Sequence, residues 1–341
     1  MRPFLQALLA ACLFGSATPI SKLLLQDIGP YQLAGLLYLG AALFVCPIVI
    51  WRWHRGRSIL PPDALNRRRL WGAVLFGGII GPVLLLFGLR HALASSVSMW
   101  LNLETVATAI LAALIFREHI GRWAWTGNVG VVFAGILLGY QGGWAGWLGL
   151  TCVAGAALAW GIDNNLTATI DSISAEDITF WKGLIAGAIN LALGLAIEPS
   201  IPGLPWLGAL VVGGFAYGLS VALYIRSAQA MGASRSQMIF SAAPFFGVVL
   251  SATLLGEPML GLQWIACGLL IASILMIFLG RHDHLHEHAS MFHDHEHRHD
   301  DGHHDHDHPG LQPHQVHSHP HEHHVQRHAH PHWPDIHHRH H

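Results

Sequence analysis

Histidines dominate the segment 282–341. His54, His91 and His119 are the only histidines before residue 282, so this segment holds 25 of the 28 histidines in the chain. Most alternate with other residues in His-x-His series, and aspartates and glutamates fill many of the gaps. The candidate metal ligands are His282, His284, His286, His288, His293, His295, His297, His299, His303, His304, His306, His308, His317, His319, His321 and His323.

Alternating histidines suit the binding of a transition metal. In an extended chain residues i and i+2 point the same way, so neighbouring imidazoles converge on one ion. Imidazole favours Zn²⁺, Ni²⁺, Co²⁺ or Cu²⁺, and carboxylates add oxygen ligands. We expect a metal buffer or sensor of high capacity and low selectivity, and no cofactor that the protein requires. The alternative is a polyelectrolyte that responds to pH, because unperturbed imidazole titrates near pH 6.5.

A second group of polar residues lies inside the apolar run 95–116. On a continuous helix Ser98, Asn102 and Thr105 share one face, with Glu104 and Thr108 towards its edge. Ionisable groups within a membrane span are costly and face a cavity or a partner. This stripe therefore predicts a pathway for solute or coupling ion, in which Glu104 binds a proton or a cation. The alternative is hydrogen bonding between helices.

A third group combines Asp163, Asn164 and Asn165 with Lys182 in the next apolar run. If the two runs form an antiparallel helical hairpin, Asp163 and Lys182 lie at similar depths and form an ion pair. The pair either locks the hairpin or takes part in gating or substrate binding, and the sequence leaves both roles open.

The composition of the chain indicates which structural elements position these residues. Hydrophobic residues make up 52% of the chain and charged residues 11%, against about 25% charged residues in a soluble domain. Because the tail is almost wholly polar, residues 1–280 are more apolar still. A bilayer solvates so much apolar surface, whereas water does not.

We expect about ten membrane-spanning helices, since each span needs about 20 mainly apolar residues. Backbone groups in hydrocarbon must be satisfied internally, which makes these runs helical. The fold class is therefore an all-α polytopic membrane protein. The expected spans are Phe4–Leu25, Gln32–Trp51, Leu70–Leu89, Ser95–Phe116, Trp123–Tyr140, Trp147–Thr169, Ile178–Ile197, Trp206–Ile225, Ser236–Leu255 and Leu262–Leu279.

Arginines in the short loops predict the orientation. Basic residues gather in cytoplasmic loops, and here they follow the second, fourth and eighth expected spans. Both termini and the tail should then face the cytoplasm, in a multi-pass protein of the cell membrane. The arginines concerned are Arg52, Arg55, Arg57, Arg67, Arg68, Arg69, Arg117, Arg122, Arg226 and Arg235.

The sequence contains an internal repeat. Residues 35–43 parallel residues 183–191, and Glu118 matches Glu257 further along. Five helices in each half force the second half to enter the membrane from the opposite side, which is the inverted repeat of many secondary transporters. We expect a first repeat in residues 1–140, a second in 141–280, and a disordered tail in 281–341, where apolar residues are too few to form a core.

Several motifs resemble the EamA-type transporters of the drug/metabolite transporter superfamily. They are the small-residue motif at 14–19, the element Leu103-Glu104-Thr105-Val106, the glutamates Glu118 and Glu257 after the fourth helix of each half, and glycine-rich fifth helices. The resemblance covers residues 4–280. It implies the fold and a transport function, while the substrate and the role of the tail stay open.

These features together predict a secondary transporter that moves a small solute by alternating access. No ATP-binding loop is present, and no H-E-x-x-H or G-x-S-x-G lies in a spanning helix, so we expect no enzyme. The cargo is a divalent transition metal such as Zn²⁺, Ni²⁺ or Co²⁺, with the tail as buffer or sensor. The alternatives are a metabolite or amino-acid exporter regulated by metal, and a membrane-anchored metal-storage protein. Expected partners are membrane lipid and the solute, without nucleic acid; a homodimer is compatible with the sequence.

Overall fold

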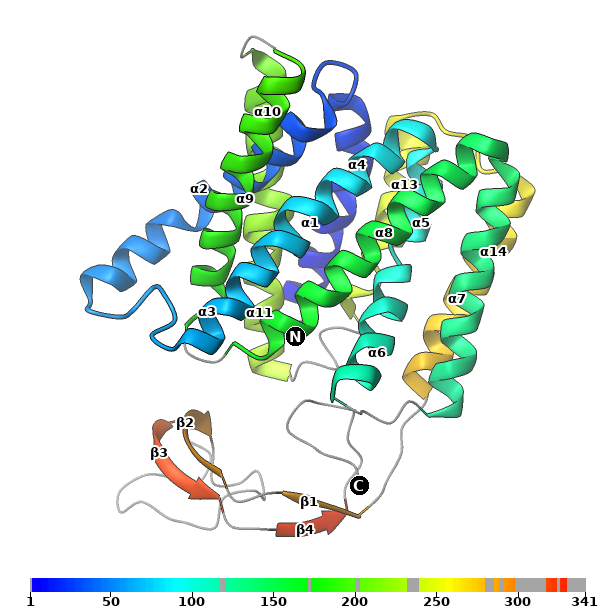
Figure 1. The fold of residues 1–341 in the computed structure, drawn as a ribbon. Helices are drawn as coiled ribbons and strands as arrows, with labels where there is room; N and C mark the ends of the chain where they lie inside the picture. Colours follow the sequence, from blue (N-terminus) through cyan, green and yellow to red (C-terminus); the bar gives the residue numbers. More distant parts are fainter. Residues whose placement is uncertain are drawn as a thin grey trace. The chain divides into compact units, whose positions relative to one another are not determined.

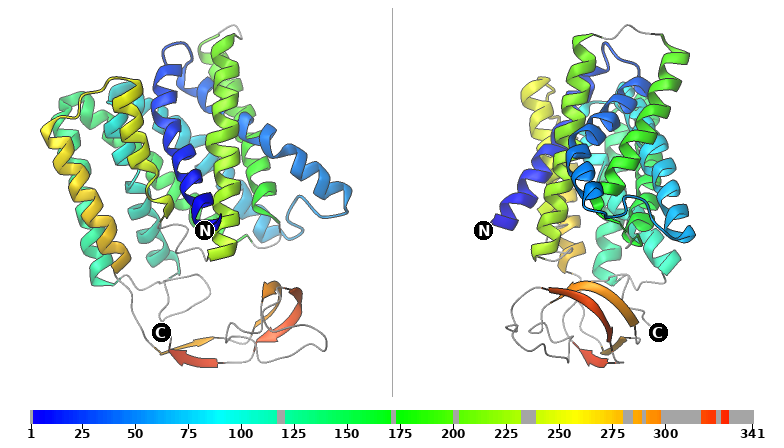
Figure 2. Two further views of the ribbon diagram at one scale, coloured as in Figure 1. Left: turned by 180° about the vertical axis from the view of Figure 1, so that it is seen from behind. Right: turned by 90° about the vertical axis from the view of Figure 1, so that its left-hand side faces the viewer.

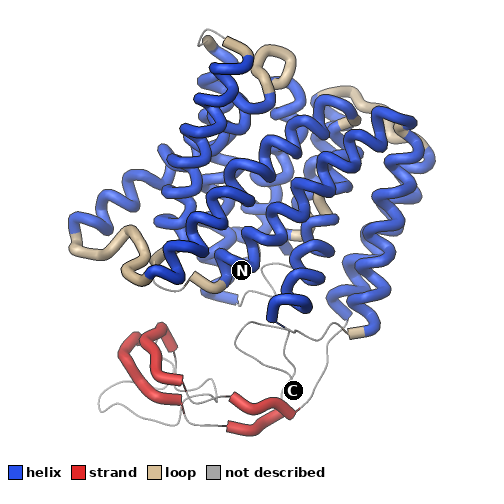
Figure 3. Tube along the Cα trace, viewed as in Figure 1, coloured by secondary structure: helices blue, strands red, loops and turns tan. Residues whose placement is uncertain are grey.

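A computed structural model describes residues 2–116, 121–170, 173–199, 203–231 and 239–279, together with four short strands in the tail. It divides into a helical unit, which holds nearly all of residues 1–280, and a second unit that contains the tail. Figure 1 shows the helical unit as a bundle of long helices with short connections, and Figure 3 shows its loops confined to the helix ends.

The first part of the helical unit comprises α1 (Arg2–Leu24), α2 (Pro30–His54), α3 (Ala64–Ala73), η1 (Val74–Ile80), α4 (Gly81–His91), α5 (Ala94–Trp100), α6 (Leu103–Phe116) and α7 (Arg122–Gln141). The second part comprises α8 (Gly143–Ala168), α9 (Ala175–Ile197), α10 (Leu204–Val212), η2 (Gly213–Leu219), α11 (Ser220–Met231), α13 (Ala243–Leu254) and α14 (Gly261–Leu279).

Within the described residues, seven helical stretches are long and apolar enough to cross a membrane. They are Pro3–Leu24, Pro30–His54, Ala64–His91, Arg122–Gln141, Gly143–Thr167, Ala175–Ile197 and Leu204–Tyr224. The other three expected spans correspond to α5 with α6, to α13 and to α14, which are shorter. Seven spans therefore meet these criteria, and the count of about ten stays a prediction.

The expected continuous helix 95–116 is wrong in one respect, because it breaks between α5 and α6. The Asn102 side chain donates a hydrogen bond of 3.0 Å to the carbonyl of Met99. Such a bond from a side chain to a nearby carbonyl competes with helical pairing. A matching break precedes α13, where residues 241–242 form a turn and Ala242 N donates to Ile239 O at 3.1 Å.

Two π-helical segments interrupt the third helix of each part at corresponding places. The segment η1 joins α3 to α4, and η2 joins α10 to α11; each spans seven residues. A π-helix widens the backbone turn, frees carbonyls from regular pairing and often marks a functional site. Each of these segments contains a Gly-Gly pair, Gly77-Gly78 and Gly213-Gly214.

The two parts pack on one another in reciprocal fashion. Helix α2 packs against α9, and α7 packs against α14; the last pair lies side by side in the left view of Figure 2. Helix α1 packs against η2 and α11, while α8 packs against η1 and α4. Each of these contacts that a helix of the first part makes with the second part thus has a counterpart made by the corresponding helix of the second part.

Close backbone approach supports the contact between α2 and α9. A Cβ at Gly35 would meet the backbone of Gly187 and Leu191, and a Cβ at Gly187 would meet the carbonyl of Gly35. Small residues let membrane helices approach closely where no hydrophobic effect drives them together. Residues 35–43 and 183–191, which the sequence identifies as repeats, thus lie on the two helices that pack together.

Large apolar side chains cover the outside of α7 and α14. Trp125, Val129 and Phe133 on α7 and Trp264 and Ile265 on α14 are each about half exposed or more. Water would solvate such a surface poorly, whereas lipid tails match it. The exposed faces therefore fit contact with hydrocarbon.

Four tail segments form strands in two antiparallel pairs: β1 (Leu285–His288) pairs with β4 (Gln326–Ala329), and β2 (Met291–His297) pairs with β3 (His317–His323). The disordered tail expected for residues 281–341 stays a prediction. The alternating sequence of the four strands is compatible with an extended, paired backbone. The rest of the tail lies outside the described residues.

Candidate functional site

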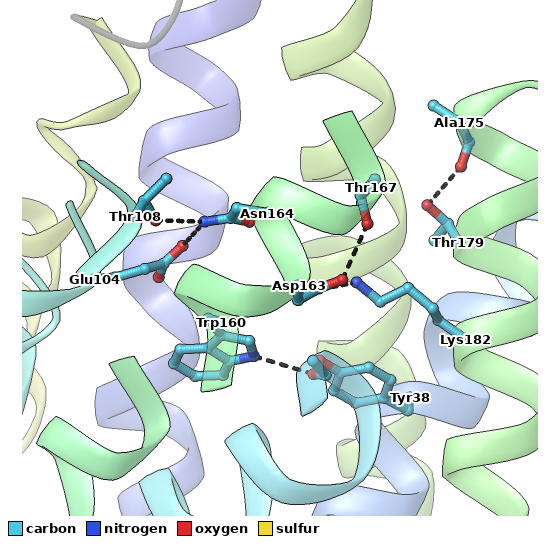
Figure 4. Close-up of polar contacts among 11 residues, drawn as sticks. Tyr38, Glu104, Thr108, Trp160, Asp163, Asn164, Thr167, Ala175, Thr179 and Lys182 are labelled. Atoms are coloured by element: carbon cyan, nitrogen blue, oxygen red, sulfur yellow. Dashed lines mark hydrogen bonds and ion pairs between the residues drawn. The ribbon is translucent and has the colours of Figure 1, made fainter. Parts of the chain in front are cut away.

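The centre of the site is Glu104, in the first turn of α6. Its Oε1 accepts a hydrogen bond of 2.8 Å from Asn164 Nδ2 on α8, and the same amide lies 3.1 Å from Thr108 Oγ1. Figure 4 shows these three side chains turned towards one another. Glu104 is half-buried and Asn164 is exposed, so the carboxylate has a polar route to its surroundings. The contact joins the two parts of the bundle.

The other polar residues of the predicted stripe lie in different surroundings. Ser98 and Asn102 are buried; Ser98 packs against Gly247 of α13, and Asn102 bonds its own helix. Thr105 is half-buried on α6. Because the helix breaks at residues 101–102, these residues do not form one continuous stripe with Glu104. Glu104 and Thr108 remain the members that face α8.

The predicted ion pair between Asp163 and Lys182 is formed. Lys182 Nζ on α9 donates to Asp163 Oδ2 on α8, and Thr167 Oγ1 donates to Asp163 Oδ1 at 3.0 Å. Asp163 is 4% exposed, and 17% of the Lys182 side chain is exposed. Glu104 lies within electrostatic range of both groups. The site thus holds two carboxylates and one ammonium group.

The neighbouring Asn165 has a structural position. Its Nδ2 donates to Gly161 O of its own helix at 2.8 Å and to Thr108 O of α6 at 3.2 Å. A Cβ at Gly161 would itself meet the backbone of Ala107 and Thr108. These contacts hold α8 close to α6 and thereby keep Asn164 beside Glu104.

The π-helix η1 supports the ion pair from the other side. The carbonyl of Gly77 accepts hydrogen bonds from Tyr38 Oη at 2.5 Å and from Trp160 Nε1 at 3.0 Å; Figure 4 shows both side chains beside Asp163. The space that a Cβ at Gly77 would need is filled by the Asp163 carboxylate. Sequence reasoning missed this arrangement, for which the pair Gly77-Gly78 is the available signal.

Aromatic rings from the second part complete the surroundings of Glu104. Tyr217 of η2 and Tyr224 of α11 both lie within its electrostatic range. Tyr217 also contacts Tyr38 and Phe14, with ring centroids 5.6 and 5.7 Å apart, and Phe240 contacts Tyr224 at 5.0 Å. Sequence reasoning missed these residues because nothing in the local pattern separates them from core aromatics.

Glu257 has a role that the sequence did not reveal. Its carboxylate accepts hydrogen bonds from the backbone amides of Ala94 and Ser95 at 2.8 and 2.9 Å, and from Ser95 Oγ at 2.8 Å. It therefore caps α5, a helix of the opposite part, with a negative charge at a helix N-terminus. Glu118, which the sequence matches to Glu257, lies outside the described residues.

The predicted metal ligands are divided by the described strands. Among them, His282, His284, His299, His303, His304, His306 and His308 lie outside the described residues. The register of β2 with β3 sets His293 opposite His321, His295 opposite His319, and His297 opposite His317. In the other pair, His286 and His288 of β1 lie opposite His328 and Gln326 of β4. His323 of β3 lies opposite Met291 of β2.

The profile of the EamA-like transporter family matches residues 1–140 and 147–279. The chain belongs to the EamA-like transporter family. It is accordingly a multi-pass membrane protein and a transporter of small solutes, as the sequence indicated.

Relatives of this EamA-like chain carry the same general description. An uncharacterized transporter of Methanothermobacter thermautotrophicus is 24% identical over 81% of this chain and 85% of its own length. The uncharacterized inner membrane transporter YedA of Escherichia coli is 24% identical over 79% of this chain and 88% of its own length. A solved crystal structure with 18% identity superimposes with a TM-score of 0.61 over 80% of this chain and 96% of that one, which shows a shared fold.

Proposed function

We propose that this EamA-like protein is a secondary transporter that moves a small solute by alternating access between two inverted five-helix halves. The observation that carries the proposal is the contact of Glu104 on α6 with Asn164 on α8. An ionisable group within a membrane-spanning helix is energetically costly and is usually retained for function, and here Glu104 bridges the two halves. Protonation of Glu104 would change this bridge and thereby couple transport to a proton gradient.

The packing of the bundle supports the two inverted halves. The π-helices η1 and η2, the breaks at residues 101–102 and 241–242, and the reciprocal helix contacts all occur at corresponding places. The family profile also matches two successive stretches of the chain. Inverted repeats with interrupted helices near the midplane are typical of secondary transporters.

The orientation belongs to the same proposal. Figure 2 shows the N-terminus and the far end of α14 at the same end of the helical unit, which requires an even number of crossings. The arginine-rich connection from α2 to α3 supports a cytoplasmic position for both ends, because basic residues gather in cytoplasmic loops. The test is a reporter that is active only outside the cytoplasm, fused after residue 341. Activity of this reporter would overturn the orientation.

The tail supports a second proposal, that it binds divalent transition metals and regulates transport. Residues opposite one another in an antiparallel pair lie about 5 Å apart, and the register of β2 with β3 sets a histidine opposite a histidine at three positions. Zn²⁺, Ni²⁺, Co²⁺ and Cu²⁺ all accept imidazole ligands. The metal is then either the cargo, with the tail as buffer, or a signal that regulates export of a metabolite.

The test is flux through the purified full-length protein in sealed vesicles. Uptake and efflux are measured for Zn²⁺, Ni²⁺, Co²⁺, amino acids and small organic acids, with an imposed proton gradient of either direction. We expect flux of at least one solute that depends on the gradient and exceeds that of empty vesicles. Absence of flux for the whole panel in both directions, from protein that is folded and inserted, would contradict the proposal.

A further inference from the structure

A cavity of about 300 Å³ opens where the ends of α1, α4, α5, α7 and α14 meet. In Figure 1 the junction of α4 with α5 and that of α7 with α8 both lie at the end of the helical unit opposite the N-terminus. The volume is within the range of small-molecule sites, about 300–1,000 Å³. The cavity is separate from the Glu104 cluster, whose residues do not line it.

The charge of this cavity has one sign. Lys22, Arg90 and His91 line it, and its lining contains no aspartate or glutamate. Among the described residues, no carboxylate forms an ion pair with any of these three side chains. Arg90 and His91 are exposed, while Lys22 is half-buried and donates to the carbonyls of Leu89 and Ala92 at 2.5 and 2.9 Å. Arg90 and Lys22 therefore present positive charge that the protein does not neutralise by direct contact.

The nearby glutamates Glu257 and Glu198 do not neutralise these positive charges by direct contact. Glu257 lies within electrostatic range of Lys22, but both of its carboxylate oxygens accept hydrogen bonds at the start of α5. Glu198 borders a smaller cavity of about 60 Å³ that Arg90 also lines. Neither carboxylate lines the larger cavity, so no acidic side chain of its lining offsets the charges of Lys22 and Arg90.

The floor of the cavity is polar and held in place. Gln263 is fully buried, and its Nε2 donates to Ser95 Oγ and Ser96 Oγ at 3.1 and 3.3 Å. Its Oε1 accepts from the backbone amide of Leu260 at 2.8 Å. A few fixed polar groups beside charged side chains are what orients a small ligand in a cavity.

We infer that this cavity is a vestibule that binds a small organic solute through its carboxylate groups before or after passage through the bundle. The inference rests on the proposed transport function and selects its metabolite alternative, since the positive charges of Lys22 and Arg90 repel a divalent cation. Arg90 forms bidentate bonds with a carboxylate, and Lys22 adds a second positive charge across the cavity.

The test uses succinate and its uncharged diamide, succinamide, as probes of matched shape. Binding is measured by calorimetry at low ionic strength on the full-length protein in nanodiscs of neutral lipid. We expect succinate to bind and succinamide not to bind. The variant Arg90→Gln should weaken succinate binding about tenfold or more, because a charge-assisted bond is lost. The matched control Arg57→Gln, in the exposed connection between α2 and α3, should leave the affinity unchanged.

Equal binding of the two probes, or an affinity that Arg90→Gln does not change, would overturn the inference. Nanodiscs that contain anionic lipid, tested at an ionic strength that screens the charge of the membrane surface, add a further arm: a tenfold loss of succinate affinity there would identify a lipid headgroup as the occupant and would also overturn the inference. Flux in vesicles keeps the two proposals apart. If solutes are transported without preference for carboxylates and without effect of Arg90→Gln, the vestibule fails while the transport function stands.

Discussion

Asp163 on α8 and Lys182 on α9 form an ion pair whose carboxylate fills the space that a side chain at Gly77 would need. Three separate helical segments, α8, α9 and η1, are thereby fixed to one another. The Asp163 carboxylate is almost fully buried, so loss of its partner Lys182 would leave an uncompensated charge and destabilise the fold.

Removal of one member of the pair should destabilise the protein strongly. Asp163→Ala or Lys182→Ala leaves one charge without its partner, and we expect a loss of about 3 kcal/mol in each case. The double variant leaves no unpaired charge, so its loss should be smaller than the sum of the two single losses. Chemical unfolding in detergent measures all three. Strictly additive losses would show that the two groups do not interact.

Gly77→Ala should disturb the same place by steric means. The new methyl group would collide with the Asp163 carboxylate, and overpacking of this kind costs about 1–3 kcal/mol. Gly268→Ala on α14 is the control, because Gly268 is exposed and a Cβ there meets nothing within 4 Å. The free energy of unfolding of this control should be unchanged or slightly higher, because alanine favours the helix more than glycine. Equal stability of the two variants would contradict the close packing at Gly77.

Glu257→Ala should weaken α5, because two backbone amides lose their acceptor. We expect a loss of about 1–2 kcal/mol in unfolding free energy, as for other lost helix caps. Glu257→Gln keeps one oxygen acceptor, so its loss should be smaller. If the alanine and glutamine variants lose the same amount, the carboxylate does not act as a cap.

The tail should bind several Zn²⁺ or Ni²⁺ ions at pH 7.5. Metal binding requires neutral imidazole, so affinity should fall as pH drops below about 6.5. Calorimetry compares the full-length protein with a variant that ends at residue 280, which should fold and transport but lose this heat. Identical binding with and without the tail would refute the prediction. An unchanged transport response to metal would reduce the tail to a passive buffer.

The sequence predicted the helical segments better than their interruptions. Apolar runs of sufficient length define spans such as 32–51 because the bilayer imposes that length. At the break at residues 101–102 the Asn102 side chain bonds the Met99 carbonyl, and no hydrophobic pattern records such a bond. The π-helices η1 and η2 each contain a glycine pair whose close tertiary contacts the sequence does not record.

The candidate site was predicted in part for a similar reason. Buried ionisable residues stand out in an apolar sequence, so Glu104, Asp163 and Lys182 were identified directly. Their partners Tyr38 and Trp160 were not, because an aromatic residue in an apolar run is indistinguishable from a core residue until the packing is known. Glu257 occupies a repeat position in the sequence. Its contact with α5 depends on how the second half packs against the first, which the repeat does not specify.

The most direct test of the account is the proton dependence of transport by Glu104→Gln. The amide keeps the shape of the side chain and removes the titratable group. In vesicles loaded with the solute found in the flux panel, transport by the unaltered protein should respond to an imposed proton gradient. The Glu104→Gln variant should fold and insert normally yet lose that response, whereas Glu176→Gln, in the first turn of α9, should retain it. A Glu104→Gln variant that transports at the unaltered rate, with the unaltered dependence on the gradient, would contradict the account.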